Sequence, residues 1–185
     1  MEERELRRIK KSFVRTDEQG CTEAACLLTV IKFYHGEIGM DELEEWCTVG
    51  GKRTIDTMKM AAIRAGMDAR LDFMSVEQLS ERKLPVILYA MNDFGKYDYA
   101  VCFGLHEGRF IVWEPCFGPM QYWPEELDTL WDWGVCMILY PGKSFVTKQP
   151  DMPWWELYGW SEKFSKKMET VKNFVELEVL PRLKR

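Results

Sequence analysis

Histidine is scarce in this chain: only two, His35 and His106, occur among 185 residues. Six cysteines are present, but no C-x-x-C pair occurs, and two histidines are too few to complete the usual structural zinc sites. We therefore expect neither a metal site nor any other cofactor.

Long apolar runs are also missing. No stretch of about 18 apolar residues exists, so no transmembrane helix is predicted. The N-terminal segment MEERELRRIKKSF is charged and has no apolar core, which argues against a secretory signal peptide. Without such a signal, the cysteines are expected to be free thiols in the cytosol: Cys21, Cys26, Cys47, Cys102, Cys116 and Cys136.

Charge is unevenly distributed along the chain. Residues 16–142 hold ten Lys or Arg and 21 Asp or Glu, whereas residues 1–15 and 143–185 each carry a net charge of +3. An acidic centre repels phosphates, which argues against a nucleic-acid partner. The simplest interpretation of the basic ends is two solvated tails, with residues 1–10 as an N-terminal arm. The alternative is attraction to a membrane surface or an acidic partner.

The first half of the chain predicts helices. Hydrophobic residues make up 46% of the sequence, which is enough for a folded core. Residues 22–34 (TEAACLLTVIKFY) are apolar around most of a helical circumference, so we expect a central buried helix that ends at Gly36. Further helices are expected over residues 41–46, over residues 54–65, and after the capping box formed by Ser75 and Gln78.

From Leu84 onward the hydrophobic period changes to two. Strands are predicted over residues 85–89, 98–104, 109–114 and 134–140, with a short helix opening at Pro124. The second and third strands form a hairpin around residues 105–108. Helices followed by a mostly antiparallel sheet indicate an α+β fold.

The C-terminal region differs in composition. Residues 146–159 read as a linker that contains Trp154 and Trp155, both expected to make exposed apolar contacts. Residues 160–185 predict an amphipathic helix. That helix either packs back on the domain, docks or forms a homodimer, or leads into a membrane segment.

Several segments resemble the peptidase C39 family, the bacteriocin leader-processing domains of peptidase-containing ABC exporters. Residues 12–34 (SFVRTDEQGCTEAACLLTVIKFY) are similar to the opening of that family. The likeness continues at residues 84–87 (LPVI), 98–101 (DYAV) and 114–118 (EPCFG), in the family's order and spacing. It implies a papain-like cysteine peptidase fold over residues 11–145.

The family's catalytic positions are changed in this chain. Under the resemblance, the catalytic cysteine falls on Thr22 and the oxyanion-hole glutamine falls on Thr16. The catalytic histidine falls on Asp98, and the aspartate that orients it falls on Glu114. All four chemical positions of the family are therefore degenerate here.

These replacements predict a site that does not hydrolyse peptides. A papain-like peptidase places a thiolate at a helix N-terminus beside an imidazole, which lowers the thiol pKa from about 8.5 to about 3–4. The hydroxyl of Thr22 is not ionised by a helix dipole, and Asp98, with an ordinary pKa of about 3.9, is a poor base near neutrality. The sequence therefore predicts a catalytically inactive pseudo-peptidase.

Two enzymatic alternatives remain open. The first is an active cysteine peptidase that cleaves leader peptides with Cys21 as the nucleophile, although Asp98 and Glu23 would raise the pKa of its thiol by like-charge repulsion. It also needs a base, yet His35 ends a helix and His106 lies in a predicted turn.

The second alternative uses the two carboxylates Asp98 and Glu114, which would be neighbours on adjacent strands. They could share a proton for acid–base chemistry or hold a metal together with Cys116. Simple hydrogen bonding within a dead site is the plainer interpretation.

The resemblance implies that a degenerate domain of this kind binds a leader peptide or a protein cargo. The expected groove lies between the 22–34 helix and the 98–114 hairpin, with Thr22, Asp98, Tyr99 and Trp113 as contacts. The implied partners are the cargo and the membrane domain of an ABC exporter, at the cytosolic face of the membrane. Exposure of Trp123, Trp131 or Trp133 would also mark a groove, since tryptophan is common in binding hot spots.

Overall fold

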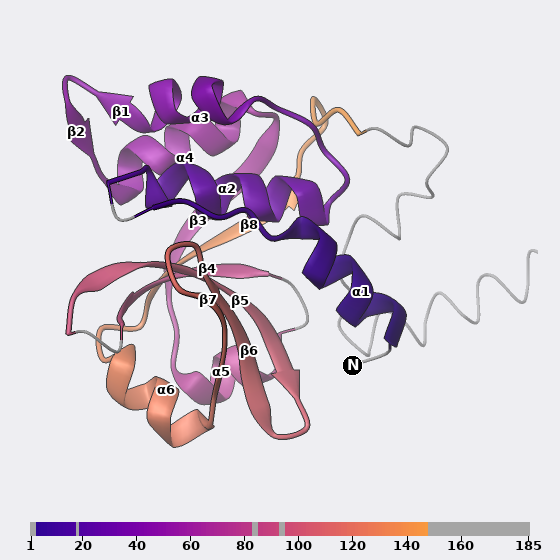
Figure 1. Ribbon diagram of the computed structural model, residues 1–185, viewed down its shortest axis with the longest axis vertical. Helices are drawn as coiled ribbons and strands as arrows, with labels where there is room; N and C mark the ends of the chain where they lie inside the picture. The colour runs from indigo at the N-terminus through magenta and orange to yellow at the C-terminus, as the bar shows by residue number, and fades with distance from the viewer. Residues whose placement is uncertain (1–2, 18, 83–84, 93–94, 148–185) are drawn as a thin grey trace, which may run out of the picture.

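The structure is a computed structural model that describes residues 3–17, 19–82, 85–92 and 95–147. The helices are α1 (Glu3–Ser12), α2 (Thr22–Phe33), α3 (Met40–Cys47), α4 (Ile55–Arg64), α5 (Val76–Ser80) and α6 (Pro124–Leu130). The strands are β1 (Thr48–Val49), β2 (Lys52–Arg53), β3 (Met67–Phe73), β4 (Val86–Met91), β5 (Tyr97–His106), β6 (Arg109–Glu114), β7 (Gly118–Tyr122) and β8 (Val135–Pro141). This order confirms the predicted α+β class, and Figure 1 shows α2, α3 and α4 gathered at one end of the molecule and α5 and α6 at the other.

The main sheet has six antiparallel strands in the order β3-β8-β4-β5-β6-β7. The predicted strands β4, β5, β6 and β8 are confirmed, as is the β5–β6 hairpin. The sequence prediction did not include β3 and β7. Strand β7 carries Pro119 and lies at the sheet edge, where a missing N–H is tolerated.

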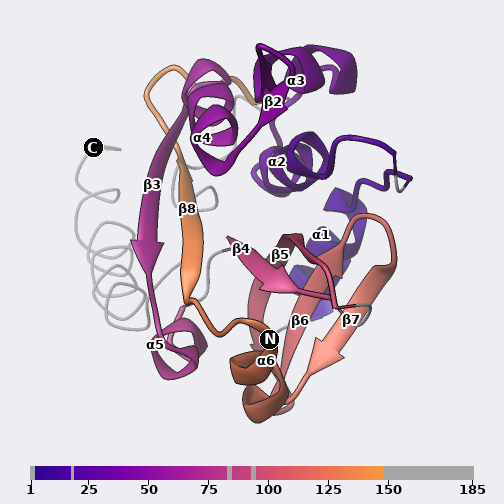
Figure 2. The same ribbon diagram turned by 90° about the vertical axis from the view of Figure 1, so that its left-hand side faces the viewer.

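Two hydrophobic cores lie on opposite faces of this sheet. Alternate residues of the strands point to opposite sides, so Ile87 and Val101 join the core beneath α2, while Leu88 and Cys102 join the core that contains α6. Helix α2 is buried at every position except Glu23 and Lys32, which confirms the predicted central helix. Figure 2 shows α2 between the sheet and the pair α3 and α4.

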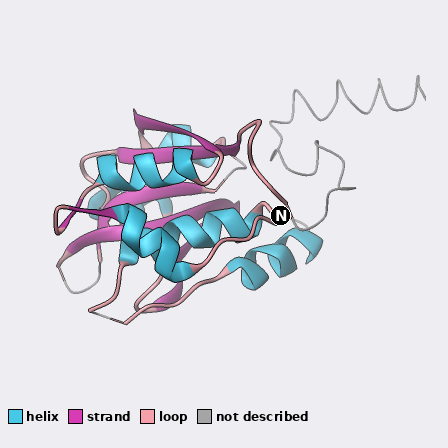
Figure 3. Cartoon of the chain, turned by 90° about the horizontal axis from the view of Figure 1, so that it is seen from above, coloured by secondary structure: helices cyan, strands magenta, loops and turns pink. Residues whose placement is uncertain are grey.

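The N-terminal arm is a packed helix, which corrects the prediction of a solvated tail at residues 1–10. Ile9 of α1 is 2% exposed and belongs to the core beneath α2. The Arg8 guanidinium lies 3.9 Å from the centre of the Phe33 ring, and its Nε donates a 2.8 Å hydrogen bond to the Phe33 carbonyl. Basic charge in this segment thus helps to attach α1 to the end of α2, and Figure 3 shows the two helices from above.

The described residues end just after the last strand. Thr147 pairs with Gly36 in an isolated antiparallel bridge, so the last described residue lies beside the C-terminal end of α2. Most of the predicted linker, Trp154, Trp155, the 160–185 helix and its homodimer lie outside the described residues. In the described part of the chain, no helix is both long and apolar enough to cross a membrane.

Candidate functional site

The first turn of α2 meets the beginning of β5. Cys21 precedes the helix in an extended conformation, and Thr22 is its first residue. The Thr22 hydroxyl Oγ1 donates a 3.3 Å hydrogen bond to Asp98 Oδ2, although 76 positions separate the two residues. The two positions that resemble the family's nucleophile and base are therefore in contact, through a hydroxyl and a carboxylate.

The Asp98 carboxylate is partly removed from water. Burial raises its pKa above the ordinary value, while the hydrogen bonds from the Tyr99 backbone N–H and from Thr22 act in the opposite direction. The net effect raises the pKa. Asp98 therefore carries a partly desolvated charge for which Thr22 is one hydrogen-bond donor.

Glu114, at the end of β6, is held by a different partner. It is 9% exposed, and its Oε1 accepts a 2.7 Å hydrogen bond from the Tyr122 hydroxyl of β7. Asp98 and Glu114 line the same pocket, whose other walls are mainly apolar side chains such as Leu88 and Val112. Its volume of about 20 Å³ is enough for about one water molecule.

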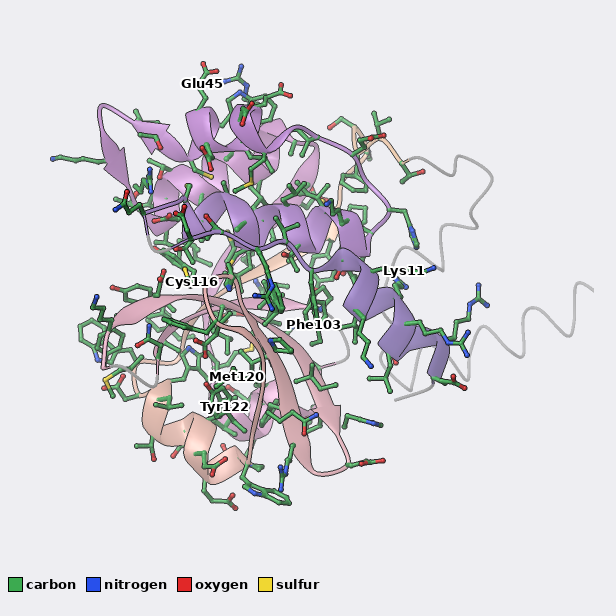
Figure 4. All side chains as sticks on the ribbon, in the orientation of Figure 1. Lys11, Glu45, Phe103, Cys116, Met120 and Tyr122 are labelled. Atoms are coloured by element: carbon green, nitrogen blue, oxygen red, sulfur yellow. The ribbon has the colours of Figure 1, made fainter. Side chains whose placement is uncertain are left out.

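The segment before α2 is fastened to the end of β6. The Thr16 N–H donates a 3.2 Å hydrogen bond to the Pro115 carbonyl. The Thr16 hydroxyl packs so closely on Gly20 that a Cβ there would lie 1.7 Å from it. Figure 4 labels Cys116, whose thiol lies 3.5 Å from the Asp17 carbonyl oxygen at this junction. Thr16 is thus near the site but lacks the amide N–H₂ that an oxyanion-hole glutamine supplies.

Trp113 is not a surface contact, which corrects its prediction as a peptide-binding residue. Its ring is 2% exposed and stacks on Phe13 with the ring centres 4.1 Å apart. Its Nε1–H donates a 3.0 Å hydrogen bond to the Val14 carbonyl. The side chain points to the face of β6 that the segment before α2 covers. It therefore packs against this segment and does not face a ligand.

The Cys21 thiol lies against Glu23 and Cys47. It is fully buried and donates a 3.6 Å hydrogen bond to Glu23 Oε2. A hydrogen bond with Cys47 of α3 lowers the pKa of Cys21 below its ordinary value, although burial and the Glu23 charge both act to raise it. The sequence analysis considered only the repulsion that Asp98 and Glu23 would exert if Cys21 were the nucleophile, and it did not include the contact between Cys21 and Cys47.

No imidazole lies near the Cys21 thiol or the Thr22 hydroxyl. His106 is eight residues from Asp98 along β5, about 26 Å at about 3.3 Å per residue. His35 follows the C-terminal end of α2, and the two ends of that helix are about 17 Å apart at about 1.5 Å per residue. Neither histidine can act as the base for Thr22 or Cys21.

A group of aromatic residues beside Asp98 was only partly predicted. Tyr99 is half-buried, and its ring centre lies 5.1 Å from that of Tyr89, its direct partner in the β4–β5 register. Tyr97 continues the group, and Trp133 is 63% exposed next to it. Alternating tyrosines at 97 and 99 were the sequence signal, but only the strand pairing brings Tyr89 to them.

The described residues hold no group of three or more His, Cys, Asp or Glu side chains arranged to bind a metal ion. Asp98 and Glu114 each have a hydrogen-bond partner of their own. The arrangement thus offers a carboxylate, a hydroxyl and aromatic faces, which suit the binding of a polar or cationic group.

Comparison with known proteins places this arrangement in context. The family model described as Peptidase C39 family matches residues 10–144. No curated protein matches the sequence.

Three solved structures with the same fold share 20–22% identity with the chain. The peptidase domain of Streptococcus ComA, a bifunctional ABC transporter, superposes with a TM-score of 0.61 at 20% identity over 69% of this chain and 96% of that one. A double-glycine-motif protease from an AMS/PCAT transporter, solved with its leader peptide, gives 0.59 at 20% identity over 69% and 90%. The N-terminal peptidase C39-like domain of a Vibrio parahaemolyticus toxin secretion ATP-binding protein gives 0.53 at 22% over 65% and 97%.

The predicted resemblance and the papain-like order of elements are thereby confirmed. With a family match over most of its length and the fold of solved C39 domains, this chain belongs to the peptidase C39 family.

Proposed function

We propose that this protein is a non-hydrolytic C39 domain that binds a leader peptide or protein cargo for an ABC exporter at the cytosolic face of the membrane. The observation that carries the proposal is the hydrogen bond from Thr22 to Asp98. It joins two groups that cannot form a thiolate–imidazolium pair, at the positions that resemble the nucleophile and the base of a C39 peptidase.

Several features support binding without cleavage. The contact between α2 and β5 keeps the two sides of the site together. A solved C39 relative of the same fold carries a leader peptide, which supports a peptide as the ligand class. Tyr99 and Asp98 remain partly exposed, so a peptide can reach them, whereas Trp113 is withdrawn into the core.

The direct test separates binding from cleavage. The purified protein is mixed with a fluorescein-labelled synthetic peptide. This peptide consists of a leader segment that ends in a double glycine, followed by a few further residues. Binding is read by fluorescence anisotropy and cleavage by mass spectrometry of the same sample. We expect saturable binding and an intact peptide after prolonged incubation.

A matched pair of variants locates the binding site. Asp98→Ala should weaken binding about tenfold or more, because a charged hydrogen-bond acceptor worth about 1.5–3 kcal/mol is removed. Asp41→Ala, at the exposed start of α3, removes the same charge elsewhere and should leave binding unchanged. Equal effects of the two variants would contradict the proposed location.

A second candidate function is peptide cleavage by Cys21, and its lowered pKa is the observation that favours it. Complete burial and the absence of a nearby imidazole oppose it. If the wild-type protein cleaves the peptide and Cys21→Ser abolishes cleavage while binding persists, this second function is correct and the non-hydrolytic proposal is wrong.

A further inference from the structure

Part of the sheet face beneath α2 is not covered by that helix. Ile87 of β4 and Val101 of β5 point to this face and are fully packed against the core. The same face continues two residues further along each strand with Tyr89 and Tyr99, because side chains alternate between the two faces. Both tyrosines are half-buried, so the apolar surface extends beyond the N-terminal end of α2.

Four aromatic side chains form a continuous row on this extension. We call Tyr99, Tyr89, Tyr97 and Trp133 the aromatic row. Successive ring centres lie 5.1 Å, 5.6 Å and 5.9 Å apart, so the rings are in contact along the row. Tyr97 is 38% exposed and Trp133 is 63% exposed. The exposure of the row therefore increases from Tyr99, next to Asp98, to Trp133.

Carboxylates lie along the aromatic row. The Tyr97 hydroxyl donates a 2.9 Å hydrogen bond to Asp132 Oδ1, at the exposed end. At the other end, burial raises the pKa of Tyr99, and the negative charges of Glu23 and Asp98 act in the same direction. The row therefore combines aromatic faces with negative charge.

This combination is complementary to a positive charge on an aliphatic stem. A lysine ammonium or an arginine guanidinium is attracted to the face of an aromatic ring, and the attraction is strengthened by a neighbouring carboxylate. The methylenes of such a side chain would also cover apolar ring surface. An acidic side chain would instead be repelled by Asp132 at the exposed end of the row, or by Glu23 and Asp98 at the other end.

We propose that the aromatic row selects peptide cargo that carries a lysine or arginine beside the segment held at Thr22 and Asp98. This inference rests on the proposed peptide-binding function and names the chemistry of its ligand. Trp133 and Tyr97 supply the ring faces, and Asp132 supplies the charge at the exposed end.

The test compares two fluorescein-labelled leader peptides that end in a double glycine and differ only in their cationic positions. One peptide carries lysine at four positions, and the other carries glutamine at the same four. Affinities are measured by fluorescence anisotropy with the full-length protein at low and at physiological salt. We expect the lysine peptide to bind about tenfold more tightly, with the preference reduced at higher salt.

Variants of two exposed tryptophans locate the preference. Trp133→Ala should reduce the lysine preference to less than about threefold, whereas Trp123→Ala should leave the preference as it is in the wild type. Trp123→Ala is the matched control, because Trp123 is 44% exposed at the start of α6 and is not part of the aromatic row. Circular dichroism verifies that both variants remain folded, as exposed positions allow.

The possible results are distinguishable. Equal affinity for both peptides overturns the cationic preference but leaves the peptide-binding function standing. Binding of neither peptide overturns the proposed function and this inference together. A lysine preference that Trp123→Ala reduces and Trp133→Ala does not would overturn the assignment to the aromatic row.

Discussion

At the scale of single residues, one pair decides the chemistry of the site. Thr22 and Asp98 occupy a helix N-terminus and a strand end that the fold brings within hydrogen-bond distance. A threonine hydroxyl stays protonated there, and a carboxylate beside it cannot serve as an imidazole does in proton transfer. The adjacent Cys21 carries a thiol, the nucleophile of a cysteine peptidase, but this thiol is fully buried and hydrogen-bonded to Glu23.

Restoring both missing groups should restore an activated thiol. In Thr22→Cys/Asp98→His, an imidazolium beside the introduced thiol is expected to lower its pKa, whereas in the single variant Thr22→Cys the Asp98 charge should raise it. Iodoacetamide alkylation of the introduced thiol, followed by peptide mass spectrometry between pH 5 and pH 9 (ordinary thiol pKa about 8.5), measures both values. At pH 7 we expect the double variant to react at least about tenfold faster than the single one, and equal rates would contradict the geometry.

Asp98 also predicts an unusual pH dependence of stability. Because its pKa is raised in the folded state, the folded protein binds more protons than the unfolded chain between the ordinary value of about 3.9 and the raised one. The free energy of unfolding therefore falls as pH rises through this window. The Asp98→Asn variant should not show this fall in the free energy of unfolding. Its stability relative to the wild type should therefore increase as pH rises through the window.

Asp72 serves as the opposite control. Its pKa is lowered, first by the hydrogen bond from the Phe73 N–H, so its ionised form stabilises the folded state above the ordinary pKa, and this contribution is lost as pH falls. Asp72→Asn should accordingly lower stability at neutral pH relative to acid pH. Urea unfolding at several pH values measures both variants, and parallel slopes would refute the assignment for Asp98.

At the scale of secondary structure, α1 is attached to the domain through the C-terminal end of α2. Ile9 enters the core, while Arg8 lies on the Phe33 ring and bonds to the Phe33 carbonyl. A cation near the last carbonyls of a helix is favourable because it complements the helix dipole. The basic composition of this segment therefore has a structural role.

Truncation of Ile9 tests this attachment. Ile9→Ala should lower the free energy of unfolding by about 2–4 kcal/mol, since it removes a buried side chain and leaves a cavity. Lys10→Ala, on the exposed side of the same helix, should change it by less than about 0.5 kcal/mol. Urea titration followed by tryptophan fluorescence gives both values; similar small changes would mean that α1 does not contribute to the core.

At the scale of the whole molecule, one sheet joins two hydrophobic cores. Leu27 lies in the core beneath α2, and Leu127 of α6 lies in the core on the other face. The strands between them contribute alternate side chains to both cores, so neither core can form without the sheet. The molecule should therefore unfold as one unit.

Cooperativity can be measured directly with one variant in each core. Leu27→Ala and Leu127→Ala should each lower the free energy of unfolding by about 2–5 kcal/mol and shift a single transition. Far-ultraviolet circular dichroism and tryptophan fluorescence should give the same midpoint for each variant. Separate midpoints for the two probes would show two independently stable halves.

Local sequence patterns predicted most elements of the sheet and helices. The fully apolar 22–34 segment predicted α2, and the runs ending at Tyr89 and Tyr140 predicted β4 and β8. Strand β3 was not predicted, although Met67, Ala69 and Leu71 alternate with charged residues, because an amphipathic strand of this length carries a weak signal.

The sequence by itself indicated the fold family and, through the resemblance to that family, predicted which positions are degenerate and that no thiolate–imidazole pair forms. These follow from residue identity and spacing, which act locally. Only the tertiary structure decided that Cys47 lowers the pKa of Cys21, that Trp113 is buried under Phe13, and that three tyrosines and Trp133 form one surface. Each of these depends on contacts between segments far apart in the chain, and such contacts are fixed by strand register and helix packing.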